Sequence, residues 1–262
     1  MEPHQKPLAR AAVSPIVARR VLLVVLLMCW EVAPRAGLIP KLFLPPLSEA
    51  LAVGFQDRAL FLSNLAVTLG EVAVSVVVCC GGGVVLGSII GSIPLLRVPL
   101  TSMLSSFYAI PLVILYPLMA AWLGIGPESK IAFASLYGIA PAALASAAGI
   151  QSIDPQFSLT ARSLGATLTQ RIVHVIIPAA IPSILSAIRI GASLAIIGVV
   201  VAEMLTSSAG IGFLITSYRT VLDSARVFAA ILSVLAIAIA SDSALRILER
   251  RASRWNAATR EN

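Results

Sequence analysis

Long apolar stretches separated by short polar segments dominate the pattern of this 262-residue chain. A helix needs about 20 apolar residues to cross the hydrocarbon core of a bilayer. Windows of that length predict an all-α, polytopic membrane protein with six transmembrane helices. The predicted spans lie near residues 18–36, 62–90, 100–122, 129–150, 182–205 and 227–247. Together they form one transmembrane domain over residues 18–247.

Glycine and proline mark two of these spans. Gly83, Gly87 and Gly91 recur at four-residue spacing in the second span, so three bare backbone positions share one helical face. We expect a neighbouring helix to pack closely against them. Pro111 and Pro117 in the third span each remove a backbone donor. They are candidates for a translocation pathway or gate, with simple packing kinks as the alternative.

The composition agrees with a membrane protein. Apolar residues make up 58% of the chain and charged residues only 12%, whereas a soluble domain has roughly 25% charged residues. The formal net charge is +7, but the basic residues stand mostly at the ends of apolar runs, where they face lipid headgroups. Nucleic-acid binding is therefore not expected. The three cysteines lie within apolar stretches and two of them are adjacent, so no metal site is predicted.

The basic residues also predict an orientation, because Lys and Arg are retained on the cytoplasmic side. With six spans and both termini inside, thirteen of the 19 Lys and Arg residues fall on that side. We therefore expect cytoplasmic tails at residues 1–17 and 248–262, the second of them basic. Lys130 and Arg219 are then expected in external loops. A cleaved signal peptide is the alternative for the N-terminus, but the later spans need an anchored first helix.

Ionisable residues inside predicted spans are candidates for translocation or gating, because burying a charge in lipid is costly. Glu71, Arg189 and Glu203 are such residues. Glu203 precedes Gly210 and Gly212, where an external gate loop is expected. The alternative for Arg189 is that its long side chain extends to the inner surface of the membrane.

The longest predicted internal connection, residues 151–181, has a helical pattern of its own. Asp154 is a suitable N-cap, and Gly165 is suited to the left-handed conformation that ends many helices. A second helix is expected from about Thr167, ending before Pro178 because a residue that precedes proline leaves the helical region. The pattern predicts a helix-turn-helix at the inner membrane face, with a plain solvated loop as the alternative.

This loop carries a specific resemblance. Residues 161–166, Ala-Arg-Ser-Leu-Gly-Ala, followed by Val-Ile-Ile-Pro at 175–178, resemble the E-A-A-x3-G-x9-I-x-L-P signature of binding-protein-dependent ABC importer permeases. That signature marks the coupling helix. The remainder of the chain resembles the nitrate, sulfonate and taurine branch of this family in several short segments. They are Trp30-Glu31, Leu44-Pro45-Pro46, Gly124-Ile125-Gly126, Ile188-Arg189-Ile190-Gly191, Ala202-Glu203 and Gly210-Ile211-Gly212.

The chain departs from the family pattern at two places. Leu159 and Thr160 stand where the signature has its Glu and first Ala. The ion pair that the family often makes from this Glu to the ATPase cannot form, so coupling is expected to depend on shape and on Arg162. Glu71 stands where relatives usually carry a basic residue, which puts expectations about the outer cavity in doubt.

The resemblance implies a type I ABC importer permease fold like that of the methionine importer. It implies a homodimer of this permease in the bacterial inner membrane, two copies of an ATP-binding subunit, and a periplasmic or lipid-anchored solute-binding protein. The solute would be small and polar or anionic, such as nitrate, a sulfonate or taurine. The residues assigned to ATPase coupling are Ala161, Arg162, Leu164, Gly165, Ala166, Arg171 and Pro178.

The chain itself is predicted to be non-catalytic and without a cofactor. A P-loop needs G-x4-G-K-[S/T], and none of the three lysines follows a glycine. ATP and magnesium would therefore be bound by the partner ATPase. An ion-gradient-driven secondary transporter is the alternative function, but it would predict repeated halves with broken helices. A membrane enzyme is a further alternative, and no catalytic motif supports it.

Overall fold

A computed structural model of the chain describes residues 14–258, and the predicted tails at 1–17 and 248–262 lie partly outside that range. The described part is helical and has no strand. Its first half contains α1 (Pro15–Arg35), α2 (Leu47–Gln56), α3 (Arg58–Ser92), α4 (Pro94–Ala109), a short 3-10 turn (Leu112–Leu115), α5 (Tyr116–Leu123) and α6 (Pro127–Gln151). Its second half contains α7 (Pro155–Ser163), α8 (Leu168–Arg171), a π-helical turn (Ile172–Ile176), α9 (Ile177–Thr206), α10 (Ile211–Thr220) and α11 (Ser224–Ala258).

Long helices coincide with most of the apolar windows. Four helical segments are long and apolar enough to cross a membrane, at 58–92, 127–151, 168–206 and 224–249. The bent pair α4 and α5 gives a fifth if it is counted as one span. Helix α1 corresponds to the first predicted span, 18–36, but each 18-residue window within it holds at least three charged residues. Its apolar side chains from Val21 to Met28 are all exposed.

The third predicted span, 100–122, is not one straight helix. Helix α4 ends at Ala109, and the segment 112–123 turns away from it by 78°. Ile110 has an extended backbone with ψ of 134°, because the ring of Pro111 clashes with a helical residue before it. Pro117 lies in the first turn of α5, where its missing N–H costs no helical hydrogen bond. One proline therefore breaks the span and the other begins the next helix.

The expectation that Pro178 ends the second loop helix is wrong. The chain is helical without interruption from Leu168 to Thr206. The π-helical turn explains this continuity, because Ile177 donates its N–H to the carbonyl of Ile172, five residues earlier. This shift of hydrogen-bond register places Pro178 in the first turn of α9, where a proline is tolerated. The loop hairpin is thus joined directly to a spanning helix.

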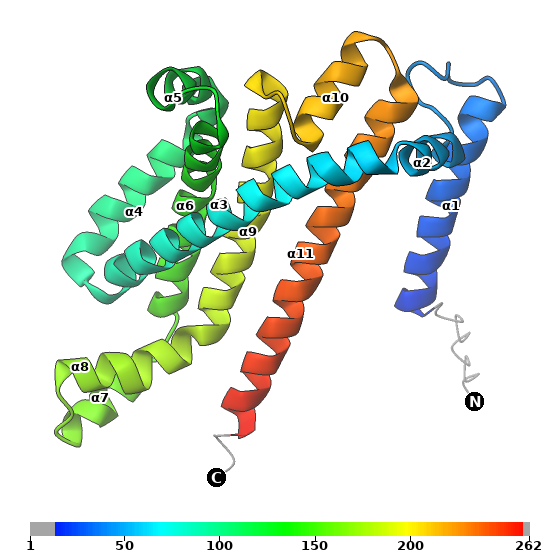
Figure 1. Ribbon diagram of the computed structural model, residues 1–262. Helices are drawn as coiled ribbons and strands as arrows, with labels where there is room; N and C mark the ends of the chain where they lie inside the picture. Colours follow the sequence, from blue (N-terminus) through cyan, green and yellow to red (C-terminus); the bar gives the residue numbers. More distant parts are fainter. Residues whose placement is uncertain (1–13, 259–262) are drawn as a thin grey trace, which may run out of the picture.

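Helix α6 is the centre of the bundle and packs against α3 on one side and α9 on the other (Figure 1). Small residues make this packing close. A Cβ on Gly87 would lie 2.3 Å from the carbonyl oxygen of Ala143, and one on Gly83 would lie 2.6 Å from the Cβ of Ala142. A Cβ on Gly91 would lie 2.9 Å from the Cβ of Ile150. The backbones of α3 and α6 could not approach this closely with larger residues.

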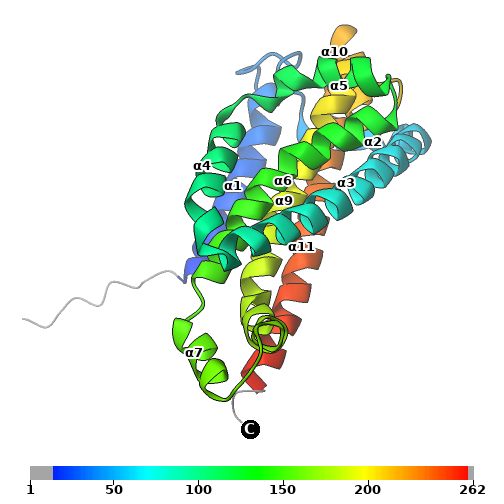
Figure 2. The same cartoon turned by 90° about the vertical axis from the view of Figure 1, so that its left-hand side faces the viewer.

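The bundle has two ends of different character (Figures 1 and 2). The helical hairpin of α7 and α8 projects from one end, which we call the hairpin end. The start of α1 and the end of α11 lie toward the same end. Helices α2, α5 and α10 lie at the opposite end, which we call the α10 end.

Replacing Gly87 with Ala tests the close packing of α3 on α6. The added methyl group would meet backbone atoms of α6 that cannot move independently, so we expect a destabilisation of about 1–3 kcal/mol. Gly81 lies on the same helix with nothing within 4 Å of its Cβ position, and Gly81→Ala is the control. Thermal unfolding of the purified variants measures the difference. Equal unfolding temperatures for the two variants would contradict the packing.

Candidate functional site

The hairpin, residues 154–171, is built from strong local signals. Asp154 caps α7 by accepting a hydrogen bond of 2.9 Å from the backbone N–H of Gln156. Thr167 and Gln170 form a reciprocal capping box at the start of α8. Gly165 joins the two helices with φ of +80°, in the left-handed region that disfavours side chains. These features fix the angle between the two helices.

The seven coupling candidates lie on the hairpin and at the base of α9. Ala161 accepts a hydrogen bond from the N–H of Ala166, and Arg162 accepts one from the N–H of Gly165, each at 3.0 Å. These two bonds close the end of α7. Arg171 reaches back from α8 to α7, with 3.4 Å between its Nη1 and the Oγ of Ser158. Pro178 is half-buried in the first turn of α9.

The hairpin exposes apolar side chains, with Leu164 in the turn at its tip. Leu164 is 83% exposed, and Phe157, Leu159 and Leu168 are also exposed. Leu159 occupies the position of the signature Glu, and it extends this apolar surface by one side chain. Apolar groups at the end of a projecting hairpin are suited to burial against a partner, because their transfer from water is favourable.

A polar cluster lies at the α10 end and contains Asn64, Thr68, Glu71, Lys130, Glu203 and Ser207. Its central group is Glu203, a side chain only 1% exposed in the last turn of α9. Its Oε1 accepts a hydrogen bond of 2.8 Å from the hydroxyl of Thr68 on α3. Its Oε2 accepts one of 2.7 Å from the N–H of Gly212 on α10. One carboxylate therefore joins three helices.

Two further bonds fix the loop between α9 and α10. Asn64 Oδ1 accepts the N–H of Gly210 at 2.8 Å, and Thr68 Oγ1 accepts the N–H of Ile211 at 2.9 Å. The backbone of Gly210 has φ of +106° and passes over Glu203, where a Cβ would lie 2.1 Å from Oε1. A Cβ on Gly212 would lie 2.4 Å from the carbonyl oxygen of Val200. Gly210 and Gly212 are therefore both needed for this loop to lie against the carboxylate.

Glu71 and Lys130 form a second part of the cluster. Glu71 Oε1 pairs with Lys130 Nζ, and Nζ also donates to Ser207 Oγ at 3.1 Å. Each of the two charged residues is only 5% exposed. The expectation that Lys130 lies in an external loop is wrong, because α6 begins at Pro127 and holds Lys130 in its first turn. The carboxylate of Glu71 compensates the charge of this ammonium group and makes its burial tolerable.

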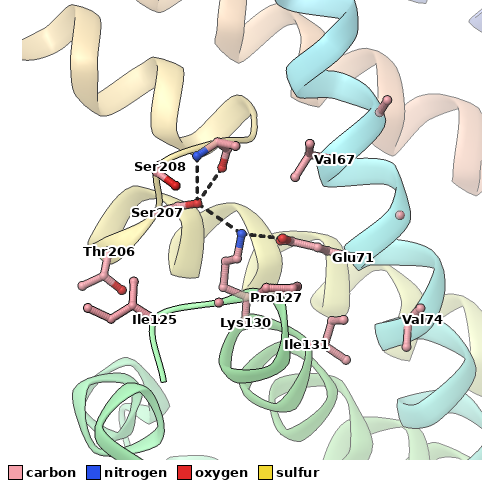
Figure 3. A pocket seen from close by; sticks show the side chains of 14 residues that line it. Val67, Glu71, Val74, Ile125, Pro127, Lys130, Ile131, Thr206, Ser207 and Ser208 are labelled. Carbon is pink, nitrogen blue, oxygen red and sulfur yellow. Dashed lines mark hydrogen bonds and ion pairs between the residues drawn. The ribbon is translucent and has the colours of Figure 1, made fainter. Parts of the chain in front are cut away.

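A cavity of about 520 Å³ lies beside this ion pair. Figure 3 shows Glu71 on α3 and Lys130 on α6 pointing toward one another, with Ser207 and Ser208 on the loop above them. Val67 and Val74 belong to the apolar part of the wall. The cavity combines a few polar groups with apolar side chains, as sites for small solutes do.

The remaining candidates lie away from this cluster. Arg189 on α9 pairs with Glu249 on α11 at 3.2 Å, and Ser186 donates to the other oxygen of Glu249 at 3.2 Å. These contacts join the two helices toward the hairpin end. Pro111 lies at the break after α4 and Pro117 at the start of α5. Among residues 14–249, no three His, Cys, Asp or Glu side chains gather to hold a metal ion.

Sequence reasoning missed four members of the cluster: Asn64, Thr68, Lys130 and Ser207. One signal was available for two of them, because Asn64, Thr68 and Glu71 recur at helical spacing and share one face of α3. Their partners on α6 and α9 are far apart in sequence, and only the folded chain brings them together.

An ion-pair network lies beyond the cluster at the α10 end. Arg226 at the start of α11 bonds Asp57 through Nε at 2.7 Å and also pairs with Asp223. Partial burial raises the pKa of Asp223, but the hydrogen bonds and charge of Arg226 outweigh it, so this pKa lies below its ordinary value. The network fixes the turn between α10 and α11 to the start of α3.

The fold and the site together define a polytopic helical permease with a projecting hairpin at one end. The chain matches the model of the family "binding-protein-dependent transport system inner membrane component" over residues 83–254, and it belongs to that family. It is 33% identical over 242 residues to the taurine transport system permease protein TauC of Escherichia coli, covering 89% of this chain and 88% of that one.

Two other comparisons agree. The formylaminopyrimidine transport permease protein ThiX of Halalkalibacterium halodurans is 26% identical over 230 residues, covering 88% of this chain and 92% of that one. The inward-facing MetNI methionine ABC transporter has a chain of similar fold, with a TM-score of 0.65 and 17% identity over 74% of this chain and 97% of that chain. The expected family, fold class and importer-permease function are confirmed, and the ion-gradient-driven alternative is not supported.

Replacing Thr68 with Val tests the clamp on the α9–α10 loop. The change leaves the Ile211 N–H without its acceptor and Glu203 without one donor, which costs about 1–3 kcal/mol. We expect faster amide hydrogen exchange in the peptide that covers residues 207–214. Ser63 lies on the same helix, is exposed, and bonds only to the carbonyl of Leu60, so Ser63→Ala is the control. Unchanged exchange in Thr68→Val would show that the loop does not depend on this clamp.

Proposed function

We propose that this chain forms the translocation pathway of an ATP-driven importer for a small polar or anionic solute, such as a sulfonate, taurine or nitrate. Its similarity to the taurine transport permease supports this range of solutes. The polar groups beside the cavity at the α10 end support it as well, because a solute of this kind needs hydrogen-bond donors and a cationic partner. The solute would arrive from a periplasmic or lipid-anchored binding protein.

The observation that carries the proposal is the projecting hairpin with its apolar tip. In this proposal the hairpin inserts into a separate ATP-binding subunit, which binds ATP and magnesium and performs the hydrolysis. The coupling residues are Ala161, Arg162, Leu164, Gly165, Ala166, Arg171 and Pro178. Exposed Leu164 supplies apolar contact area, and exposed Arg162 supplies charge. The chain itself has no catalytic role.

Two copies of the chain and two copies of the ATPase form the complete pore in this proposal. Closure of the ATPase pair would bring the two hairpins together. Because α8 continues into α9, a hairpin displacement moves one end of a spanning helix directly. The permease is then a two-state element whose populations are shifted by ATP on one side and by the loaded binding protein on the other.

The hairpin end is cytoplasmic in this proposal, and the α10 end faces the periplasm. Both described chain ends lie toward the hairpin (Figure 1). This arrangement agrees with the excess of Lys and Arg that the sequence assigns to the cytoplasmic side.

Replacing Gly165 with Val tests the coupling role of the hairpin. A β-branched residue at φ of +80° is strained by about 1–2 kcal/mol. If the strain opens the turn, co-purification of the ATPase falls by about five- to thirtyfold. Asn tolerates the left-handed region, so Gly165→Asn is the matched control and should retain association. Co-purification and transport-linked ATP hydrolysis measure the effect. Equal values for Gly165→Val and the wild type would remove the hairpin from the coupling mechanism.

A cysteine-labelling experiment tests the orientation. Ser163→Cys at the hairpin and Lys41→Cys before α2, each in a background without native cysteines, place thiols at exposed positions of opposite ends. In spheroplasts, a membrane-impermeant maleimide should label Cys at position 41 and should label position 163 only after lysis. The reverse pattern would invert the orientation.

A further inference from the structure

The buried ion pair at the α10 end is incompletely satisfied. The ammonium group of Lys130 has three N–H donors, and the described contacts use two of them, toward Glu71 Oε1 and Ser207 Oγ. Glu71 Oε2 is buried and has no hydrogen-bond partner among the described residues. A buried carboxylate oxygen without a partner is energetically unfavourable. The pair can therefore gain interactions from a third group.

The space for such a group is adjacent. Glu71, Lys130 and Ser207 all line the cavity of about 520 Å³. Ligand sites in proteins have volumes of roughly 300–1,000 Å³, so the cavity can hold a small solute with several water molecules. Gly126 and Pro127 also line it, and they bring the N-terminal turn of α6 to its wall, where the helix dipole favours an anionic group.

The pairing of Glu71 with Lys130 restricts which solutes can bind both residues. A simple anion that binds Lys130 competes with Glu71 and leaves this buried carboxylate without compensation. A simple cation that binds Glu71 likewise leaves the buried charge of Lys130 without compensation. A zwitterion offers an opposite charge to each partner, so it can separate the pair without leaving an unpaired buried charge. The second carboxylate nearby, Glu203, already accepts bonds from Thr68 and Gly212.

We propose that this cavity is a selectivity site for small zwitterions, in which the ammonium group of the solute binds Glu71 and its anionic group binds Lys130. This inference rests on the proposed import function and specifies its solute class. Because Glu71 and Lys130 are in direct contact, the two charges of the solute must be close together, on a short chain. Ser207, already bonded to Lys130, is placed to contact the anionic group (Figure 3).

Equilibrium binding to the purified transporter without its binding protein tests this inference. The probes are taurine and β-alanine, each compared with its counterpart lacking the amino group, ethanesulfonate and propanoate. In the wild type we expect each zwitterion to bind at least about tenfold more tightly than its counterpart, since the counterpart leaves Glu71 unpaired. Equal affinities within each pair of probes, or binding of neither zwitterion, would overturn the inference.

The variants locate the preference at the ion pair. Glu71→Gln and Lys130→Gln should each abolish the tenfold preference. Because either change leaves one buried charge unpaired, the double variant Glu71→Gln with Lys130→Gln is the decisive one, as it removes both charges. Glu128 is an exposed acidic residue in the same helical turn as Lys130, and Glu128→Gln should keep the preference. A double variant that keeps it would show that the cavity does not select the solute.

The same preparations separate this inference from the proposed function. ATPase association and ATP-dependent uptake with the binding protein report on import, whereas the zwitterion preference reports on the cavity. Intact energised uptake with no preference in the wild type contradicts the selectivity site alone. Failure of the wild-type chain to associate with an ATPase contradicts the proposed function.

Discussion

The carboxylate of Glu203 is the interaction on which the α10 end depends. A backbone amide that is buried away from water needs a partner in the protein, because an unsatisfied buried N–H is costly. Glu203, Thr68 and Asn64 supply these partners for three consecutive N–H groups, those of Gly210, Ile211 and Gly212. The glycines are the complementary requirement, because side chains on them would collide with Glu203 or with the backbone of α9. The conformation of the loop therefore depends on the buried carboxylate, and the carboxylate fits beneath the loop only because the loop has glycines at 210 and 212.

The clamp is connected to the hairpin by one element. The helix from Leu168 to Thr206 has 39 residues, roughly 58 Å measured along its axis at about 1.5 Å per residue. Its first turn belongs to the hairpin, and Glu203 lies in its last turn. The π-helical turn at Ile172–Ile176 keeps it continuous where Pro178 would otherwise interrupt the hydrogen bonds. Close packing of α3, α6 and α9 through small residues makes this unit stiff. The hairpin is thus joined to the clamp by continuous helical backbone, with a bend where α8 continues into α9 (Figure 1), rather than by an irregular linker.

Hydropathy alone predicted the all-α class and the approximate positions of the helices, because the bilayer sets a minimum apolar length. Capping and turn residues predicted the hairpin as well, because Asp154, Gly165 and Thr167 act through local hydrogen bonds and backbone conformation. The prediction placed Lys130 in a loop because a lysine is expected to be exposed unless a partner for its charge is known. Its partner, Glu71, lies 59 positions earlier in the sequence. A helix end was predicted before Pro178, but the π-helical turn at Ile172–Ile176 lets the helix continue past it. The sequence pattern does not reveal such a turn. Hydropathy windows also joined α4 to α5, since apolarity does not report a change of direction.

The residue at position 71 decides what the cavity can bind. A basic residue there would repel Lys130 across the same gap and create a site that attracts anions. Glu71 instead neutralises Lys130, so the wall carries both signs of charge in direct contact. An anion must then compete with a carboxylate that is already in place, whereas a zwitterion replaces both partners at once. The charge at one position of α3 thereby sets the preferred solute of the proposed site, and the hydrogen bonds of the clamp do not involve Glu71.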